Sequence, residues 1–436
     1  MAAPDSLKQA LELRLRTAQA EGLPSISAAV VRKGEVIWAD AVGLANVESA
    51  TRATPDTQYR IGSITKTFTA VAVMQLRAKG LVDLDDRLDA HLPGVGHATP
   101  TIRRLLAHLS GLQREAGDMW ITGEVPELDE IVALAANSER VLEPGIAFHY
   151  SNLAFALLGQ VVAERTETPY VDWVNRTIIE PLGLARTTWS EQAPVAQGYL
   201  VQAYEGGVWP EPHIDTKGVV AMGQLWSTVT DLAQWATFLA EGDDAVLPKT
   251  EVDRMWFPQV MVHPDEWVAA YGLGVKLVNR GGAIYGGHGG AMPGHLAGVC
   301  IHRPSGVGAA VLTNSGALGA PEATAIDLAE KTRELWPEQP VEWRPQPPAP
   351  SEIQALLGRW WSEGGEFVFS WKDGHLQAVP VGAPAWLRPA VFDSEGEGVY
   401  RARSGYERGE KLVVVGPDEL AWGGYPFTRA QAPWTF

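Results

Sequence analysis

A run of prolines near residue 340 constrains this chain more than any other feature. The segment 336–351, WPEQPVEWRPQPPAPS, holds six prolines in sixteen residues. Proline fixes its own φ angle and lacks a backbone N–H, so this run can form neither a helix nor an interior strand. It predicts a stiff, extended linker. The chain is therefore expected to fold as two domains, residues 1–335 and 352–436, on either side of it.

The longer domain has strand patterns at both ends and a helical middle. Residues 25–48 alternate as paired strands, and strand patterns return at 271–278, 295–303 and 306–314. Between about 81 and 214, apolar residues recur mostly at helical spacing. This order predicts an α/β (α+β) fold, in which helices flank an antiparallel sheet and a helical region is inserted.

Residues 352–436 have short strand patterns separated by turn residues. Asp373 and Gly374 separate two alternating segments, which is typical of a two-residue β-hairpin turn. We expect a small antiparallel β-barrel or half-barrel here.

Composition excludes several functions. A net charge of −17 disfavours phosphate backbones and anionic membranes. The one cysteine, Cys300, allows no intrachain disulfide and lies in an apolar segment typical of a buried side chain. The N-terminus lacks a signal-peptide pattern and no segment has the length of a membrane span, so a cytoplasmic protein is expected. The histidines lack metal-ligand spacing, so we expect neither metal nor cofactor.

Ser63 and Lys66 lie one helical turn apart at the start of YRIGSITKTFTAVAVMQL (59–76). The apolar run that follows predicts a buried helix, and burial lowers the pKa of a lysine. Lys66 could then act as the base for a nucleophilic Ser63, with backbone N–H groups at the helix start stabilising an oxyanion. A serine helix cap beside a snorkelling lysine would give the same pattern, and both interpretations stay open.

Tyr150 and Asn152 precede a second apolar helix in FHYSNLAFALLGQVV (148–162). If the two helices meet, Lys66 would lower the pKa of the Tyr150 phenol, which could then relay protons. Asn152 could hold both the lysine and a substrate amide. A helix cap at Asn152 or at the preceding serine is the structural alternative.

A glycine-rich strand, IYGGHGGAMPGHLAGV (284–299), surrounds His288. Glycines let a substrate backbone approach closely, although a simple turn between strands would look the same. By contrast, His108 and Gly111 in TIRRLLAHLSGL (101–112) indicate a structural feature, namely a helix end closed by glycine.

In this order and background, the three motifs resemble those of the serine β-lactamase and penicillin-binding-protein superfamily. The resemblance runs along residues 20–330 and is strongest to the class C β-lactamase-like branch, which includes esterases, D-aminopeptidases and DD-peptidases. Residues 352–436 resemble the lipocalin-like modules of some members. The resemblance implies a small-molecule or short-peptide substrate and these roles: Ser63 as acylated nucleophile, Lys66 and Tyr150 in proton transfer, Asn152, His288, Gly289 and Gly290 in substrate binding, and the backbone N–H groups of Ser63 and Ala291 as oxyanion hole.

One departure from the family pattern bears on the substrate. The β-lactam specialists carry Lys-Thr-Gly where this chain has His288-Gly289-Gly290. A neutral imidazole binds a carboxylate more weakly than an ammonium group does. We therefore expect an esterase or D-amino-acid peptidase rather than an efficient β-lactamase, with Trp120 and Trp226 as candidates for an acyl pocket. A penicillin-binding or sensor protein that acylates without turnover is the alternative.

Overall fold

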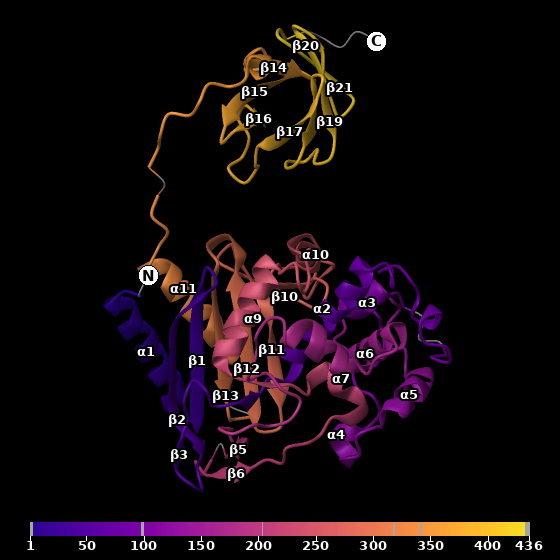
Figure 1. Ribbon diagram of the computed structural model, residues 1–436, viewed down its shortest axis with the longest axis vertical. Helices are drawn as coiled ribbons and strands as arrows, with labels where there is room; N and C mark the ends of the chain where they lie inside the picture. Colours follow the sequence, from indigo (N-terminus) through magenta and orange to yellow (C-terminus); the bar gives the residue numbers. More distant parts are fainter. Residues whose placement is uncertain (1–2, 97–99, 203, 317–318, 341, 432–436) are drawn as a thin grey trace. The chain divides into compact units, whose positions relative to one another are not determined.

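An antiparallel sheet brings the two ends of the first unit together (Figure 1). The computed structural model describes residues 3–96, 100–202, 204–316, 319–340 and 342–431. It divides the chain into two units, 1–338 and 339–436. The strand order is β3 (Thr51–Arg52), β2 (Glu35–Asn46), β1 (Ser25–Arg32), β13 (Val307–Thr313), β12 (His295–His302), β11 (Ala283–Met292), β10 (Lys276–Arg280), β9 (Ala269–Tyr271) and β8 (Val260–Met261).

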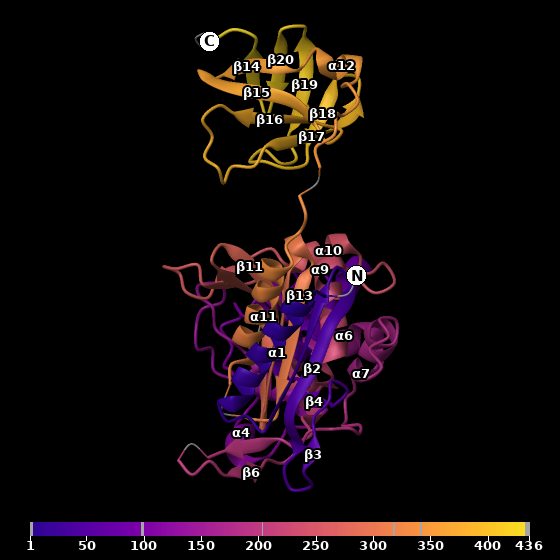
Figure 2. The same ribbon diagram turned by 90° about the vertical axis from the view of Figure 1, so that its left-hand side faces the viewer.

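Helices cover both faces of the sheet (Figure 2). In β1, Val30 packs into the core beneath α1 (Asp5–Ala20) and α11 (Pro321–Leu335), whereas Val31 packs into the core beneath α9 (Val229–Glu241). Successive strand residues point to opposite faces, and both faces are buried. This is why the central strands are continuous apolar runs.

The predicted helical region lies beside the sheet. Helix α2 (Thr65–Ala78) packs against α6 (Asn152–Thr166) and is buried on nearly every side. Its Phe68 ring stacks on Trp235 of α9, with 3.7 Å between centroids. Within the described residues, no helix combines the length and apolar character needed to cross a membrane. The remaining α-helices of this unit are α3 (Ile102–Leu106), α4 (Met119–Thr122), α5 (Ile131–Asn137), α7 (Tyr170–Val174), α8 (Val220–Gly223) and α10 (Lys249–Met255).

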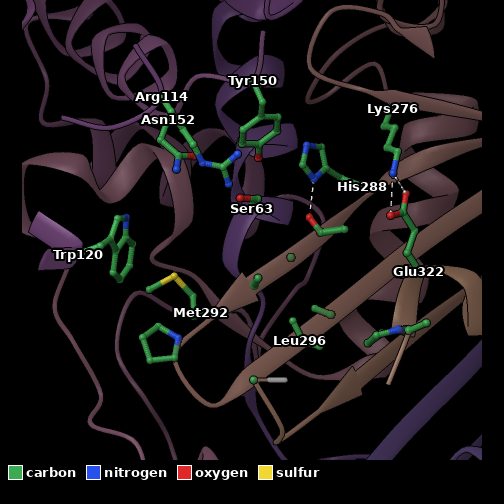
Figure 3. A pocket seen from close by; sticks show the side chains of 18 of the residues that line it. Ser63, Arg114, Trp120, Tyr150, Asn152, Lys276, His288, Met292, Leu296 and Glu322 are labelled. Carbon is green, nitrogen blue, oxygen red and sulfur yellow. Dashed lines mark hydrogen bonds and ion pairs between the residues drawn. The ribbon is translucent and has the colours of Figure 1, made fainter. Parts of the chain in front are cut away.

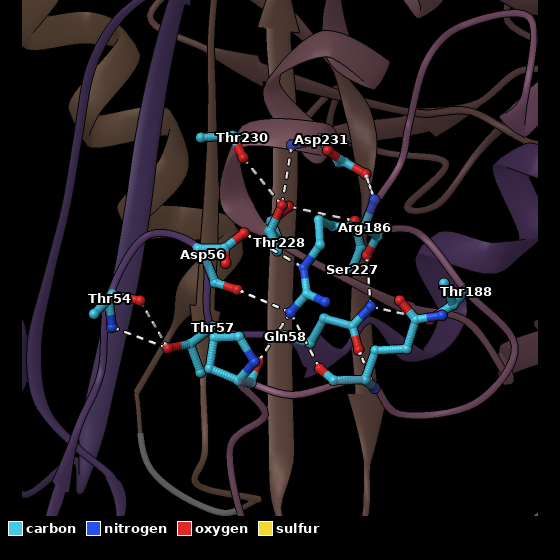
Figure 4. Close-up of polar contacts among 12 residues, drawn as sticks. Thr54, Asp56, Thr57, Gln58, Arg186, Thr188, Ser227, Thr228, Thr230 and Asp231 are labelled. Carbon is cyan, nitrogen blue, oxygen red and sulfur yellow. Dashed lines mark hydrogen bonds and ion pairs between the residues drawn. The ribbon is translucent and has the colours of Figure 1, made fainter.

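A polar network holds the segment that leads to Ser63 (Figure 4). The Gln58 side-chain amide donates to the carbonyl of Arg186 at 2.7 Å. The Arg186 guanidinium in turn donates to three backbone carbonyls at 3.1 or 3.2 Å. Just beyond Gln58, β4 (Tyr59–Arg60) pairs with β7 (Trp226–Ser227). The chain therefore enters the nucleophile turn from a fixed direction.

The second unit is a closed antiparallel barrel whose strands follow one another in chain order. Asp373 and Gly374 have φ angles of +51° and +75° and form the predicted hairpin turn. The sheet-and-helix fold and the C-terminal barrel expected from the sequence are both confirmed. The barrel strands are β14 (Gly358–Ser362), β15 (Gly365–Lys372), β16 (His375–Pro380), β17 (Ala390–Gly396), β18 (Val399–Ala402), β19 (Lys411–Gly416), β20 (Glu419–Trp422) and β21 (Tyr425–Thr428).

Aromatic side chains fill the barrel, so its stability depends on them. Trp360 is fully buried and its indole N–H donates to the carbonyl of Leu356 at 2.7 Å. We expect Trp360→Ala to lower the free energy of unfolding of this unit by about 3–5 kcal/mol, because it leaves a large cavity. Trp386→Ala is the control, since Trp386 is 69% exposed, and should change it by less than about 0.5 kcal/mol. Calorimetry of the full chain would measure both, and equal shifts would contradict this account.

Candidate active site

Lys66 lies directly beneath Ser63. Ser63 occupies a single 3₁₀ turn (Gly62–Ile64) that leads into α2, and Lys66 follows in the first turn of that helix. The Lys66 ammonium nitrogen is 2.9 Å from Ser63 Oγ and 2.8 Å from the carbonyl oxygen of Met222. The lysine has no exposed surface. Burial lowers its pKa well below the ordinary 10.5, only partly opposed by the negative charge of Glu115. Burial therefore favours the neutral amine, which is the form that can accept the proton of the serine hydroxyl.

Tyr150 completes the group of three. Its hydroxyl points toward Ser63 (Figure 3), and Lys66 Nζ is 5.0 Å from the centroid of its ring. Burial raises the pKa of the Tyr150 phenol, and the contact with Ser63 opposes this only in part. The expectation that Lys66 would lower this pKa is wrong, because burial of the phenol outweighs the contributions that lower its pKa. Tyr150 is thus a protonated phenol at neutral pH.

His108 fixes the position of Tyr150, which the sequence interpretation missed. His108 adopts a left-handed conformation, φ +57°, just after α3; Gly111, also left-handed, comes three residues later. The imidazole is fully buried and stacks on the Tyr150 ring, with 4.2 Å between centroids. Its Nδ1 accepts a hydrogen bond from the backbone N–H of Ser151 at 3.1 Å. The predicted structural segment therefore also supports the site.

Strand β11 contacts the nucleophile turn backbone to backbone. A Cβ atom on Gly290 would lie 1.9 Å from the carbonyl oxygen of Ile61. One on Gly62, whose φ is +49°, would lie 2.7 Å from the backbone nitrogen of Ala291. Both positions therefore require glycine. This packing places the backbone nitrogen of Ala291 beside the turn that holds Ser63, as an oxyanion hole shared by the two residues would require.

Asn152 is engaged differently from the expectation. Its amide nitrogen donates to Glu115 at 2.7 Å rather than binding the lysine. Glu115 also accepts from Arg114 at 3.2 Å and from the Trp120 indole at 3.0 Å. The Asn152 Oδ1 atom is buried without a hydrogen-bond partner among the described residues.

A cavity of about 1040 Å³ opens above Ser63. Seven of the eight predicted site residues line it, and Lys66 is the eighth, beneath them. Trp120 also lines the cavity, as expected, but Trp226 does not. Trp226 is buried in β7 against the rings of His213 and His295, so its assignment to an acyl pocket is wrong.

His288 is a neutral wall of this cavity. It is buried, with Nε2 3.2 Å from the Tyr271 hydroxyl and Nδ1 2.5 Å from the carbonyl oxygen of Gly289. Burial, and then the charge of Lys66, lower the pKa of His288 to about 3. The imidazole therefore carries no charge at neutral pH, as the sequence interpretation assumed.

The charged residues that line the cavity also include Lys276 of β10, Glu322 of α11 and Glu211. Sequence reasoning did not select them, although a lysine inside an apolar strand is a recognisable signal. Among the described residues, no group of three or more His, Cys, Asp or Glu side chains is placed to hold a metal ion.

The chain belongs to the Beta-lactamase family, which it matches over residues 11–333. Residues 349–429 match a second family, described as a domain of unknown function (DUF7586). The chain is 28% identical to Beta-lactamase-like protein 2 of Dictyostelium discoideum over 289 residues, which is 61% of this chain and 48% of that protein. It thus spans about half the length of the curated relatives it matches.

Solved structures share the fold. A D-stereospecific amidohydrolase from Streptomyces sp. is 29% identical, with a TM-score of 0.64, and the match covers 73% of this chain and 97% of that one. The octameric penicillin-binding protein homologue from Pyrococcus abyssi has a TM-score of 0.66 at 24% identity, covering 97% of this chain and 99% of that one.

The buried amine predicts a specific pH dependence. A lysine base acts when deprotonated, so reaction of Ser63 with a fluorophosphonate should rise with pH and level off well below pH 10.5, because burial lowers the Lys66 pKa. Lys66→Arg, which stays charged, should slow labelling by about 10²–10⁴-fold. Lys79→Arg, at the exposed end of the same helix, is the control. A rate that keeps rising through pH 10.5 would contradict the assignment.

The contact between β11 and the nucleophile turn predicts sensitivity to one methyl group. Gly290→Ala would force the strand away from Ile61, and we expect labelling of Ser63 to fall by about 10²-fold or more as the oxyanion donors move. Gly416→Ala is the control, because a Cβ there meets open space. Intact-mass kinetics would measure both, with circular dichroism to check folding.

Proposed function

We propose that this chain is a serine hydrolase that cleaves esters or amides through an acyl-enzyme on Ser63. The observation that carries this proposal is the fully buried Lys66 amine, whose Nζ lies 2.9 Å from Ser63 Oγ and whose pKa is lowered by burial. Membership of the Beta-lactamase family supports it. So does the similarity to a D-stereospecific amidohydrolase.

The proposed acylation moves one proton around a closed path. Lys66 takes the proton of the Ser63 hydroxyl as Oγ bonds to the substrate carbonyl carbon. The carbonyl oxygen becomes an oxyanion, stabilised by the N–H groups of Ser63 and Ala291. When the bond to the leaving group breaks, the Tyr150 phenol protonates the leaving atom and is reprotonated by Lys66. Water then attacks the carbonyl carbon of the acyl-enzyme, and the same groups transfer protons in the reverse order.

The cavity favours an uncharged acyl or aminoacyl substrate over a β-lactam. Its volume fits a small molecule or short peptide, and apolar side chains such as Met292 and Leu296 contribute to its lining. His288 is neutral, so the third motif supplies no cation for a β-lactam carboxylate. Asn152 lines the cavity, and its Oδ1 atom, which has no partner among the described residues, would accept an N–H group of an amide or amine if the side chain turned toward the substrate. We therefore propose an esterase or D-amino-acid peptidase or amidase.

Covalent labelling followed by turnover tests this proposal. Wild-type protein incubated with a fluorophosphonate should gain the mass of one adduct, and Ser63→Ala should gain none. Ser49→Ala, at an exposed serine, should label like the wild type. Equal labelling of wild type and Ser63→Ala would refute the nucleophile.

Turnover separates the hydrolase from a sensor. We expect many turnovers per site on p-nitrophenyl esters or on D-amino-acid p-nitroanilides, and slow turnover of nitrocefin. Stoichiometric acylation by a fluorescent penicillin without turnover on any substrate would instead identify a penicillin-binding or sensor protein.

A further inference from the structure

An ion pair occupies one wall of the cavity. The Lys276 ammonium is 2.8 Å from the Glu322 carboxylate (Figure 3), and the two side chains are 28% and 29% exposed. They come from different layers of the fold, Lys276 from β10 and Glu322 from the first turn of α11. The pair is therefore a product of the tertiary fold and remains accessible to a bound molecule.

Two paired glycines make room for this carboxylate. Gly289 of β11 stands opposite Gly298 of β12. A Cβ on Gly298 would lie 2.4 Å from the backbone nitrogen of Glu322, so glycine allows α11 to rest on the sheet. A Cβ on Gly289 would lie 3.0 Å from Glu322 Oε2. Gly289, which follows His288 in the third motif, thus leaves room for the Glu322 carboxylate.

The ion pair would lie on the leaving-group side of Ser63. In the proposed mechanism Tyr150 protonates the leaving atom, so the leaving group must lie beside the phenol. Glu322 and Tyr150 line the same cavity. Figure 3 shows Glu322 and Lys276 on the opposite side of Ser63 from Trp120. The acyl group would then extend toward Trp120, and the leaving group toward the ion pair.

We propose that Glu322 selects against leaving groups that carry a carboxylate, because it already neutralises the ammonium group of Lys276. An anionic leaving group would meet a like charge beside the cation, and such juxtapositions are strongly unfavourable. Neutral or cationic leaving groups meet no such barrier. This inference rests on the proposed hydrolase and adds the class of leaving group to it.

Three aryl acetates that differ in one substituent test the inference. Phenyl acetate, 3-carboxyphenyl acetate and 3-(trimethylammonio)phenyl acetate share an acyl group and differ in the charge of the leaving group. For each probe, kcat/KM of a variant is divided by that of the wild type, which cancels the intrinsic reactivity of the ester. Any remaining difference among the three ratios reports the charge of the site.

Glu322→Gln should raise the ratio for the carboxylate probe by about tenfold or more over that for phenyl acetate, and lower the ratio for the cationic probe. Adding Lys276→Gln to Glu322→Gln should abolish the gain for the carboxylate probe, because the gain comes from the Lys276 ammonium group that no longer pairs with Glu322. Lys276→Gln alone should lower the ratio for the carboxylate probe below that for phenyl acetate. Glu330→Gln is the matched control, since Glu330 lies in the same helix, pairs with Arg280 and is 27% exposed. In Glu330→Gln the ratios for the three probes should be equal.

The outcomes distinguish the two proposals. Absence of Ser63-dependent hydrolysis of all three acetates, of the p-nitrophenyl esters and of the D-amino-acid p-nitroanilides would refute the hydrolase itself. Ser63-dependent hydrolysis with equal ratios for all three probes in Glu322→Gln and in Lys276→Gln would refute the charge selection alone. A gain for the carboxylate probe that persists in the double variant would also refute it, because Lys276 would not be the cause.

Discussion

The removal of Lys66 from water is the constraint on which the site depends. An amine at the surface would be protonated near neutral pH and could not accept a proton from a neighbouring hydroxyl. Helix α2 packs against α6 and α8, and Trp235 of α9 stacks on its Phe68 ring, so the lysine at the start of α2 has no contact with solvent. The apolar residues that build this core thus also set the chemistry of Ser63. Tyr150 is affected in the opposite way, because burial keeps the phenol protonated.

Local patterns in the sequence were sufficient to predict much of the fold and part of the site. The proline run, the strand alternation and the Asp373-Gly374 turn each depend on neighbouring residues, and the two-part fold follows from them. The spacing of Ser63 and Lys66 predicts their contact because both lie at the start of one helix. The direction of the Tyr150 pKa could not be obtained this way, since it depends on the total burial of three groups from distant segments.

Other features depend on contacts between segments far apart in the chain. The stacking of His108 on Tyr150 requires the loop after α3 to meet the start of α6, and the Lys276–Glu322 pair requires a helix to lie on paired glycines. A tryptophan such as Trp226 has the same local pattern whether it lines a cavity or fills a core. Spacing along the chain therefore identifies the reacting groups better than it identifies the walls around them.

The pairing of β1 with β13 has a consequence during protein synthesis. Strand β1 ends at Arg32, whereas β13 begins at Val307, so one leaves the ribosome long before the other. At usual elongation rates the delay is roughly 15 to 55 s. Throughout that interval an apolar strand lacks one neighbour and exposes unpaired backbone groups, which is the situation in which chaperones bind nascent chains. Translation of nearly the whole first unit must precede the appearance of a working nucleophile.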